Sequence, residues 1–382
     1  MPIDRQMFSE KLSRYMDQLR VDPEDLARGT GFPPERIRKL LDREADPTGD
    51  EVLILADFFK CDFKFFISNE RLAAFEQTEA LFRKYGTELS KEDRWAIQEL
   101  LFLCESQQFL ITELRGAVPK VPRIAKRGNF FKSHGIDAAA QLREHFQVRP
   151  NEAISNVYRL FRDMGVHVFR RKLGKSTISG LFVRSPVAGP CVLVNYSESV
   201  VRQRFTAAHE AGHALLDDDQ DFSVSYFSAA GDDLREVRAN AFASALLLPK
   251  SLLASIPDNR NWGTEKILRY ATHLQVSAEA LSYALEGAGL ISSEQVAVFK
   301  ELKLGANAVP DPELPSSLSA RGLERKLQLL QRGLSDSYVE LCFEAYGQAV
   351  VSMGRLSELL LVSEGELIEL STLYGRPLSY GD

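Results

Sequence analysis

The stretch TAAHEAGHALL, residues 206–216, places two histidines four positions apart in a mostly apolar run. Residues with this spacing lie on one face of an α-helix, so His209 and His213 can present their imidazole nitrogens to one metal ion. Two histidines side by side on an apolar helix would otherwise be buried polar groups in need of partners. The spacing therefore favours a metal site over an ordinary amphipathic helix.

Glu210 directly follows the first histidine, and it points roughly 100° away from it around the helix axis. Its carboxylate would stand beside the metal rather than on it, where it can act as a general base toward water. Two ligands with a neighbouring base are the arrangement that a zinc hydrolase needs. Imidazole and carboxylate ligands also suit manganese, iron and cobalt, so Zn²⁺ is the expected ion among several compatible ones.

A third protein ligand is expected, because catalytic zinc usually has three protein ligands and one position open to water. Glu236 comes 23 residues after His213 on the next predicted helix, and Asn240 lies one turn further on. The rest of that helix is largely apolar, which favours Glu236 as a ligand rather than a solvated charge. The nearby aspartates are interpreted as a helix cap (Asp232 and Asp233) and as a solvated turn (Asp217, Asp218 and Asp219).

The sequence does not identify the residue that would stabilise the tetrahedral oxyanion formed in peptide hydrolysis. Tyr226, His167 and His273 are candidates, and each of them also fits a purely structural role.

Short apolar runs in the middle of the chain predict strands, and longer periodic runs predict helices. Gly174, Pro186, Gly189 and Pro190 fall in predicted turns, and Ser197 is the predicted N-cap of the motif helix. The strands are expected at 166–171, 179–184 and 191–196, and the helices at 135–146, 154–165, 197–216 and 232–248.

The N-terminal segment predicts short helices joined by tight turns. Asp22 as N-cap, Pro23 at the first helical position and Gly31 as a stop delimit one helix, and the next begins almost at once. This is the helix-turn-helix pattern. The apolar stretch 47–67 is expected to supply the helix that closes a small core. The second helix of the pattern is locally basic, and its candidate DNA contacts are Arg36, Arg38, Lys39 and Arg43.

Specific binding of double-stranded DNA is one interpretation of this segment. Its acidic residues outnumber its basic ones, and Pro34 and Glu35 stand where base contacts are usual. Proline cannot read a base, and glutamate accepts only from cytosine. The alternative is a helical module for protein interaction or dimerisation. If the segment binds DNA, we expect a homodimer that occupies two half-sites.

Two longer motifs resemble the ImmA/IrrE family of bacterial metallo-endopeptidases. They are RQRFTAAHEAGHALL at 202–216, preceded by CVLVN, and EVRANAFASALLLP at 236–249. The resemblance covers about 135–291, and Arg238 departs from it, standing where an acid is common. It implies that His209, His213 and Glu236 are zinc ligands and that Glu210 is the general base. It also implies a specific protein substrate, such as a repressor or antitoxin encoded nearby.

The segment DLARGTGFPPERIRKLLDREADPTGDEVLILADFF is similar to the Cro/cI-like (XRE-type) helix-turn-helix family. With both resemblances, we expect a mainly α fold with a small β-sheet. The proline-rich stretches 117–129 and 305–319 are the expected linkers. The expected domains are a five-helix helix-turn-helix domain at 1–70, a helical connector and linker at 71–128, a zincin-like α+β peptidase domain at 129–304, and a helical domain at 320–382.

The four cysteines lie far apart without paired spacing, which disfavours a cysteine-based zinc site and suits reduced thiols. There is no apolar run long enough to span a membrane, and the charged N-terminus lacks the apolar core of a signal peptide. We therefore expect a cytoplasmic zinc endopeptidase coupled to transcriptional regulation in a stress or phage response. The alternative is a non-enzymatic regulator that uses the peptidase fold as a sensor or dimerisation scaffold.

Overall fold

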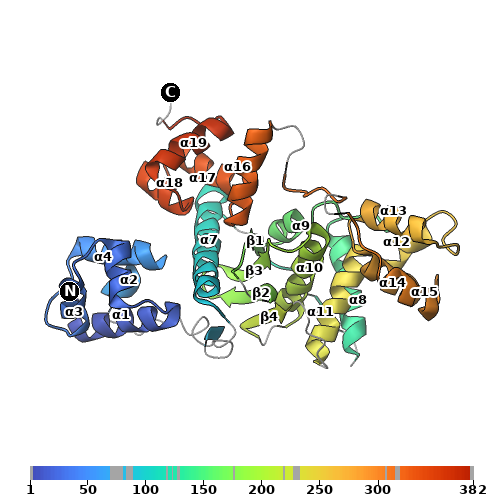
Figure 1. Ribbon diagram of the computed structural model, residues 1–382, viewed down its shortest axis with the longest axis horizontal. Coiled ribbons are helices and arrows are strands. Elements are labelled where there is room, and N and C mark those ends of the chain that lie inside the picture. The colour runs from blue at the N-terminus through green and yellow to red at the C-terminus, as the bar shows by residue number, and fades with distance from the viewer. Residues whose placement is uncertain are drawn as a thin grey trace.

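The computed structural model consists mainly of helices, which surround one small sheet (Figure 1). This arrangement confirms the expected mainly α fold with a small β-sheet. The structure describes residues 3–68, 81–82, 89–117, 119–122, 124–126, 130–174, 177–217, 220–226, 233–305, 308–314 and 319–378.

Five helices form the N-terminal bundle. The second of them begins at Pro23 after the N-cap Asp22, whose side chain accepts a hydrogen bond from the Asp25 backbone, and it ends at Gly31 in the left-handed region, as predicted. The helices are α1 (Arg5–Leu19), α2 (Pro23–Thr30), α3 (Pro34–Leu41), α4 (Gly49–Phe59) and α5 (Lys64–Ile67).

The prediction of a single helix over 47–67 is wrong. Helix α4 ends at Lys60, which takes a left-handed conformation with φ 51° and caps the helix by donating its backbone N–H to Ala56 and Asp57. A separate short helix, α5, then begins, and its Lys64 N–H donates to the Asp62 carboxylate. The apolar run is therefore split by a local cap that its composition does not reveal.

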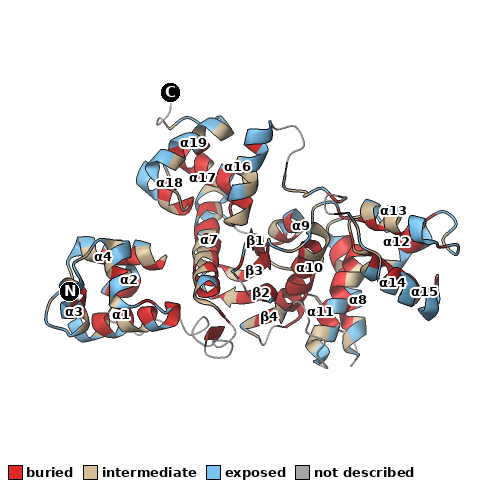
Figure 2. Cartoon of the chain, viewed as in Figure 1, coloured by how far each residue is buried: buried red, intermediate tan, exposed pale blue. Residues whose placement is uncertain are grey.

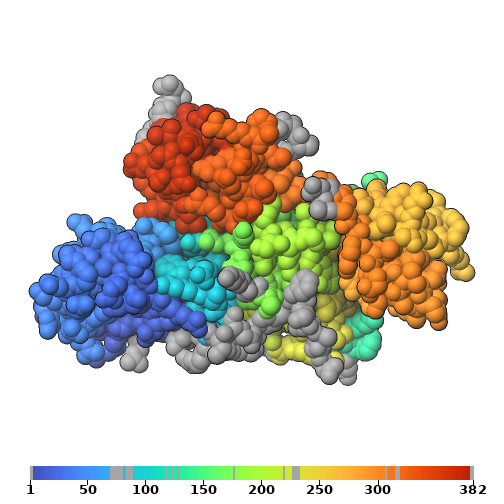
Figure 3. All heavy atoms as spheres, viewed as in Figure 1, coloured from blue at the N-terminus to red at the C-terminus, as the bar shows by residue number. Residues whose placement is uncertain are grey.

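Helix α7 (Lys91–Arg115) lies between the N-terminal bundle, the sheet and the C-terminal helices (Figure 1). Residues from all four parts share one hydrophobic core. The Arg115 guanidinium at the end of α7 makes two hydrogen bonds of 2.7 Å with the Glu344 carboxylate. Figure 3 shows the C-terminal helices seated above this region. They are α16 (Ala320–Gln331), α17 (Asp336–Gly347), α18 (Met353–Leu359) and α19 (Glu364–Tyr374).

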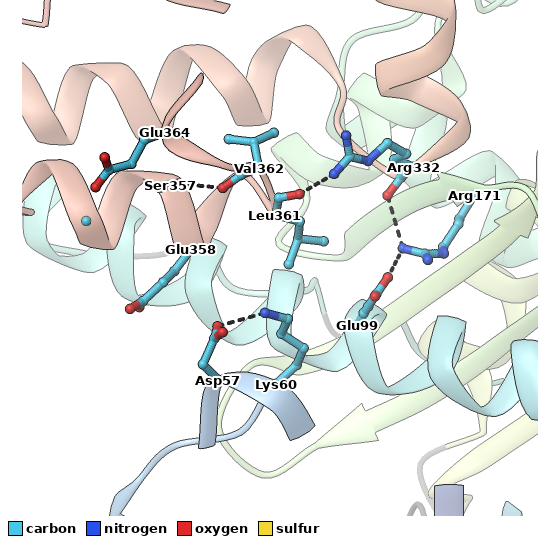
Figure 4. A pocket seen from close by; sticks show the side chains of 11 residues that line it. Asp57, Lys60, Glu99, Arg171, Arg332, Ser357, Glu358, Leu361, Val362 and Glu364 are labelled. Carbon is cyan, nitrogen blue, oxygen red and sulfur yellow. Dashed lines mark hydrogen bonds and ion pairs between the residues drawn. The ribbon is translucent and has the colours of Figure 1, made fainter. Parts of the chain in front are cut away.

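A polar cavity of about 470 Å³ lies where the end of α4, α7, the sheet and the α18–α19 turn meet (Figure 4). Its cationic side chains already have partners within the chain. Lys60 pairs with Asp57 at 2.7 Å, and Arg171 pairs with Glu99. Arg332 donates to the backbone carbonyl of Leu361.

The sheet has the strand order β1-β3-β2-β4, in which β1 and β3 are parallel and the other pairs antiparallel. The three predicted strands are present, and Gly189 and Pro190, expected in a turn, instead open the third. The fourth strand was not predicted. The strands are β1 (His167–Arg171), β2 (Ile178–Ser185), β3 (Gly189–Asn195) and β4 (Phe222–Tyr226).

Helix α10 (Val200–Leu216) covers the face of the sheet opposite α7 (Figure 1), and helices α8 (Phe131–His145) and α11 (Leu234–Leu247) pack behind it. These elements form a second hydrophobic core. Figure 2 shows α10 coloured as buried along most of its length. The same core includes α9 (Val157–Asp163), α12 (Lys250–Ala254), α13 (Thr264–Leu274), α14 (Ala278–Gly287) and α15 (Ser293–Phe299).

The predicted N-cap Ser197 is wrong by two residues, because α10 begins after Ser199. The Asn195 side chain accepts a hydrogen bond from the Ser197 N–H at 3.0 Å, so Ser197 belongs to the turn after β3. Among the described residues, no helix has the length and apolar character needed to cross a membrane.

Candidate metal centre

Helix α10 carries both histidines of the motif into the interior, between the sheet and α11. His209 is 6% exposed and His213 is 1% exposed. Glu236 lies in the first turn of α11 and is half-buried. The apolar periodicity of both helices packs them together, and this packing brings the three side chains to one point.

The ligand atoms of His209, His213 and Glu236 all lie within 4.8 Å of one another. The two Nε2 atoms are 3.1 Å apart. Each Nε2 lies 3.2 Å from one carboxylate oxygen of Glu236. Burial opposes ionisation of Glu236, but its hydrogen bonds to the two histidines outweigh burial and hold its pKa well below the usual range.

Each histidine is oriented by a partner on its other ring nitrogen. His209 Nδ1 lies 2.9 Å from the Asn240 side-chain oxygen, and His213 Nδ1 lies 2.6 Å from the Asp217 carboxylate. Both Nε2 atoms are thereby left to face the Glu236 carboxylate. Two oriented imidazoles and one ionised carboxylate are a donor set that fits a divalent ion such as zinc.

The interpretation of Asp217 as part of a solvated turn is wrong. Asp217 is 1% exposed and is ion-paired to Arg238 of α11 as well as hydrogen-bonded to His213. It stands four residues after His213, so the end of α10 places it on the face of the histidines. Asp218, Asp219 and Asp232 lie outside the described residues. Asp233 caps α11 as expected, accepting a hydrogen bond from the Arg235 backbone.

Glu210 is fully buried, and its carboxylate contacts β4. Its Oε2 accepts a hydrogen bond from Ser223 Oγ at 3.0 Å, and its Oε1 has no hydrogen-bond partner among the described residues. Burial raises the pKa of the Glu210 carboxyl above its ordinary value, against the opposing effect of the two histidines. A buried carboxylate with one uncommitted oxygen beside three ligand atoms suits proton transfer.

Two of the three oxyanion candidates, His167 and His273, lie on elements that do not build this site. His167 lies on β1 at the opposite edge of the sheet, where Gln107 and Gln108 hold its ring and burial lowers its pKa to about 4. His273 packs beside Tyr270 on α13. The backbone of Tyr226 belongs to β4, but its side chain lies outside what the structure describes.

Two residues at the site escaped sequence reasoning. Asp217 carried a usable signal, which is its four-residue spacing from His213 on the same helix. Ser223 carried none, because only the pairing of β4 with β2 places it against Glu210.

The candidate DNA contacts are placed on α3 and just beyond it, and three of them are ion-paired within the bundle. Arg36 is bound to Glu51 at 2.6 Å, and Arg38 lies 3.4 Å from Glu24. Arg43 follows α3 with φ 65° and lies 4.0 Å from Glu10. Lys39 is exposed. Arg36 therefore has a structural role, and DNA binding stays a prediction.

A motif helix packed on a small sheet, with a carboxylate from the next helix as third ligand, defines the H-E-x-x-H class of metal sites. Residues 161–286, which contain all four residues of this centre, match the family model Peptidase_M78, the IrrE N-terminal-like domain. This match supports the ImmA/IrrE resemblance over the segment that builds the site.

The chain is also similar to two curated metalloproteases. The chain is 34% identical over 98 residues to the radiation response metalloprotease IrrE of Deinococcus radiodurans, which is 25% of this chain and 30% of that protein. It is 36% identical over 98 residues to the protein of the same name in Deinococcus deserti, at 25% and 35% coverage. The chain thus spans about a third of the length of the curated relatives it matches.

Proposed function

We propose that this chain is a zinc-dependent endopeptidase. The observation that carries the proposal is the convergence of two imidazole nitrogens and the Glu236 carboxylate beside a buried Glu210 with one uncommitted oxygen. Zinc held there by His209, His213 and Glu236 supplies Lewis acidity that activates water and polarises a scissile carbonyl.

Glu210 is the proton carrier of the proposed reaction. Its Oε1 accepts a proton from the attacking water and passes it to the leaving amine. The hydrogen bond from Ser223 holds the other oxygen, so the carboxylate keeps one orientation through both transfers. Burial raises the pKa of Glu210, which makes it a stronger base than an exposed carboxylate.

The strand β4 is a suitable place for an extended peptide. It stands at the end of the described strand order and pairs with β2. Edge strands bind extended peptides through backbone hydrogen bonds. A peptide paired along β4 would run past Ser223, whose hydroxyl contacts the general base.

The proposed substrate is a specific partner protein in the cytoplasm, such as a repressor or antitoxin encoded nearby, cut during a stress response. The names of the relatives, radiation response metalloproteases, support the stress-response part of this proposal. The competing function is a non-enzymatic regulator built on the same fold, in which the metal centre has no hydrolytic role.

The test is co-expression of the chain with the product of the neighbouring gene, followed by mapping of any cut. Glu210→Gln keeps the ligands and should retain zinc while losing cleavage by about 10²–10⁴-fold, the scale of general-base catalysis. Glu105→Gln, which alters a half-buried carboxyl on α7, is the matched control and should cleave normally. Loss of zinc in Glu210→Gln, or undiminished cleavage, would contradict the assigned role. Zinc binding by the wild type without cleavage would favour the non-enzymatic regulator.

We further propose that the N-terminal bundle couples this activity to DNA. Arg38 and Lys39 are exposed on α3, whereas Arg36 is committed to Glu51. Charge reversal at Arg38 and Lys39 should therefore weaken binding to DNA upstream of the operon while cleavage of the isolated substrate survives. Each lost phosphate contact should reduce the salt dependence of log K by about one unit.

Gel retardation at low salt checks this prediction, with Lys64→Glu on α5 as a control outside α3. Binding as a homodimer should require two half-sites about one helical turn apart. Failure to retain any upstream DNA would exclude the DNA-binding role. Loss of partner-protein binding in the charge-reversed variant would instead make the bundle a protein-interaction module.

A further inference from the structure

A series of side-chain contacts extends from the metal centre through α11 to α8. The Asp217 carboxylate uses both of its oxygens, one toward His213 Nδ1 at 2.6 Å and the other toward the Arg238 guanidinium. The guanidinium carbon in turn lies 4.9 Å from the centre of the Phe131 ring on α8. These contacts therefore join α10, α11 and α8 on the side of His213 that faces away from Glu236.

The charge of Asp217 requires Arg238. An unpaired carboxylate at 1% exposure would carry a large desolvation cost. Arg238 supplies the compensating charge from α11, two residues after Glu236. The same helix thus provides a predicted metal ligand and the counter-charge for the group that orients another ligand.

The two histidines are oriented by different chemistry. His209 has the amide of Asn240, an exposed residue, as its partner. His213 has as its partner a carboxylate that also pairs with a buried arginine. A carboxylate fixes the Nδ1–H tautomer of an imidazole and raises the basicity of its Nε2 more than an amide does.

We propose that Asp217, held by Arg238, is the positioning residue that sets the metal affinity of this centre by fixing His213. Arg238 balances the charge of Asp217 and holds its carboxylate in the orientation that contacts His213. This inference rests on the proposed function, because it assumes that the three ligands bind a metal. It explains why an arginine stands at 238, where the resemblance leads one to expect an acid.

The test measures zinc binding rather than cleavage. The full-length apo-protein is titrated with Zn²⁺ in competition with a chromophoric chelator, and folding of each variant is checked by circular dichroism. Asp217→Asn is isosteric and should weaken zinc binding about 10–100-fold, the usual effect of losing such a partner. Asp221→Asn, an exposed aspartate in the segment after α10, is the matched control and should bind zinc as the wild type does.

Variants of Arg238 separate charge from packing. Arg238→Lys keeps the cation and should bind zinc within a few-fold of the wild type, whereas Arg238→Met should resemble Asp217→Asn. The visible spectrum of the Co²⁺-loaded protein should change in Asp217→Asn and in Arg238→Met, because the orientation of His213 changes. A purely structural role would leave that spectrum unaltered.

Unchanged zinc affinity in Asp217→Asn would overturn the inference, as would equal losses in Arg238→Lys and Arg238→Met. These results are distinct from failure of the proposed function. In that case the wild-type chain itself would bind no stoichiometric zinc at His209, His213 and Glu236.

Discussion

The approach of α10 to the sheet depends on one glycine. A Cβ at Gly180 of β2 would lie 2.4 Å from Thr206 Cγ2, 3.0 Å from the Leu193 carbonyl oxygen and 3.3 Å from Glu210 Cγ. The first distance is shorter than carbon atoms tolerate, and the second involves backbone that cannot easily move. Gly180 also sits at the register shift between β2 and β4. The absence of a side chain at this residue is what allows Glu210 to lie against the sheet.

Gly180→Ala should therefore push α10 away from β2. We expect a loss of about 1–3 kcal/mol in the free energy of unfolding, the usual cost of overpacking, together with reduced cleavage of the substrate. Urea denaturation and the co-expression assay measure the two effects. Gly287→Ala is the control, because a Cβ there would meet no atom within 4 Å, so its stability should change by less than about 0.5 kcal/mol. Equal effects of the two substitutions would refute the packing argument.

Among the elements, the segment 308–314, called the strap below, is bound to β1 through buried ion pairs. Arg170 of β1 is fully buried and makes ion pairs of 2.8 Å with both Asp311 and Glu313 of this strap. Its guanidinium also donates to Gln203 of α10 at 3.1 Å. Strand, strap and motif helix are therefore joined by one buried arginine.

Arg170→Met should remove about 3–5 kcal/mol from the free energy of unfolding, because it leaves two strap carboxylates buried without this cation. Although burial opposes ionisation of Glu313, Arg162 and Arg170 outweigh it and lower the pKa of Glu313. A lowered pKa stabilises the folded chain above the unfolded-state pKa, and this stability is lost as the pH falls. Urea denaturation at neutral and acidic pH should show the wild-type advantage over Arg170→Met shrinking on acidification.

Arg159→Met is the control for this experiment. Arg159 is exposed and pairs with Asp163 at 3.6 Å, and such surface pairs contribute about 0–1 kcal/mol. A comparable loss of stability in both variants would mean that the buried ion pairs of Arg170 contribute no more to stability than a surface pair does.

In the whole molecule, the sheet separates two hydrophobic cores. One contains the N-terminal bundle, α7 and the C-terminal helices, and the other contains α8 to α15. The metal ligands belong to α10 and α11, both in the second core. The two tryptophans divide in the same way, with Trp95 against the first core and Trp262 in the second.

Zinc should therefore stabilise the second core more than the first. A ligand at about 100 times its dissociation constant adds about 2.7 kcal/mol to the stability of the unit that binds it. Each of two variants keeps a single tryptophan whose fluorescence reports the thermal midpoint of its core. Trp262→Phe keeps Trp95 and reports the first core, and Trp95→Phe keeps Trp262 and reports the second. We expect zinc to raise the midpoint reported by Trp262 more than that reported by Trp95, and to raise neither in His213→Ala. An equal rise in both would show that the two cores unfold as one unit.

The sequence alone was sufficient for the features that depend on local spacing. The four-residue interval of His209 and His213 and the caps at Asp22 and Gly31 follow from helix geometry or local capping, whereas Glu236 was predicted because it begins a largely apolar helix. The three predicted ligands converge in the folded chain. The three apolar strands were predictable for a similar reason, since each is short, buried and bounded by turn residues.

Tertiary structure alone decided the surroundings of those atoms. The burial of Asp217 depends on Arg238 arriving from α11, and the contact of Ser223 with Glu210 depends on β4 pairing with β2. The cap at Lys60 broke a helix that hydrophobicity alone would have continued. Helical and strand periodicity constrain residues a few positions apart, whereas these contacts join segments brought together only by packing of the two cores.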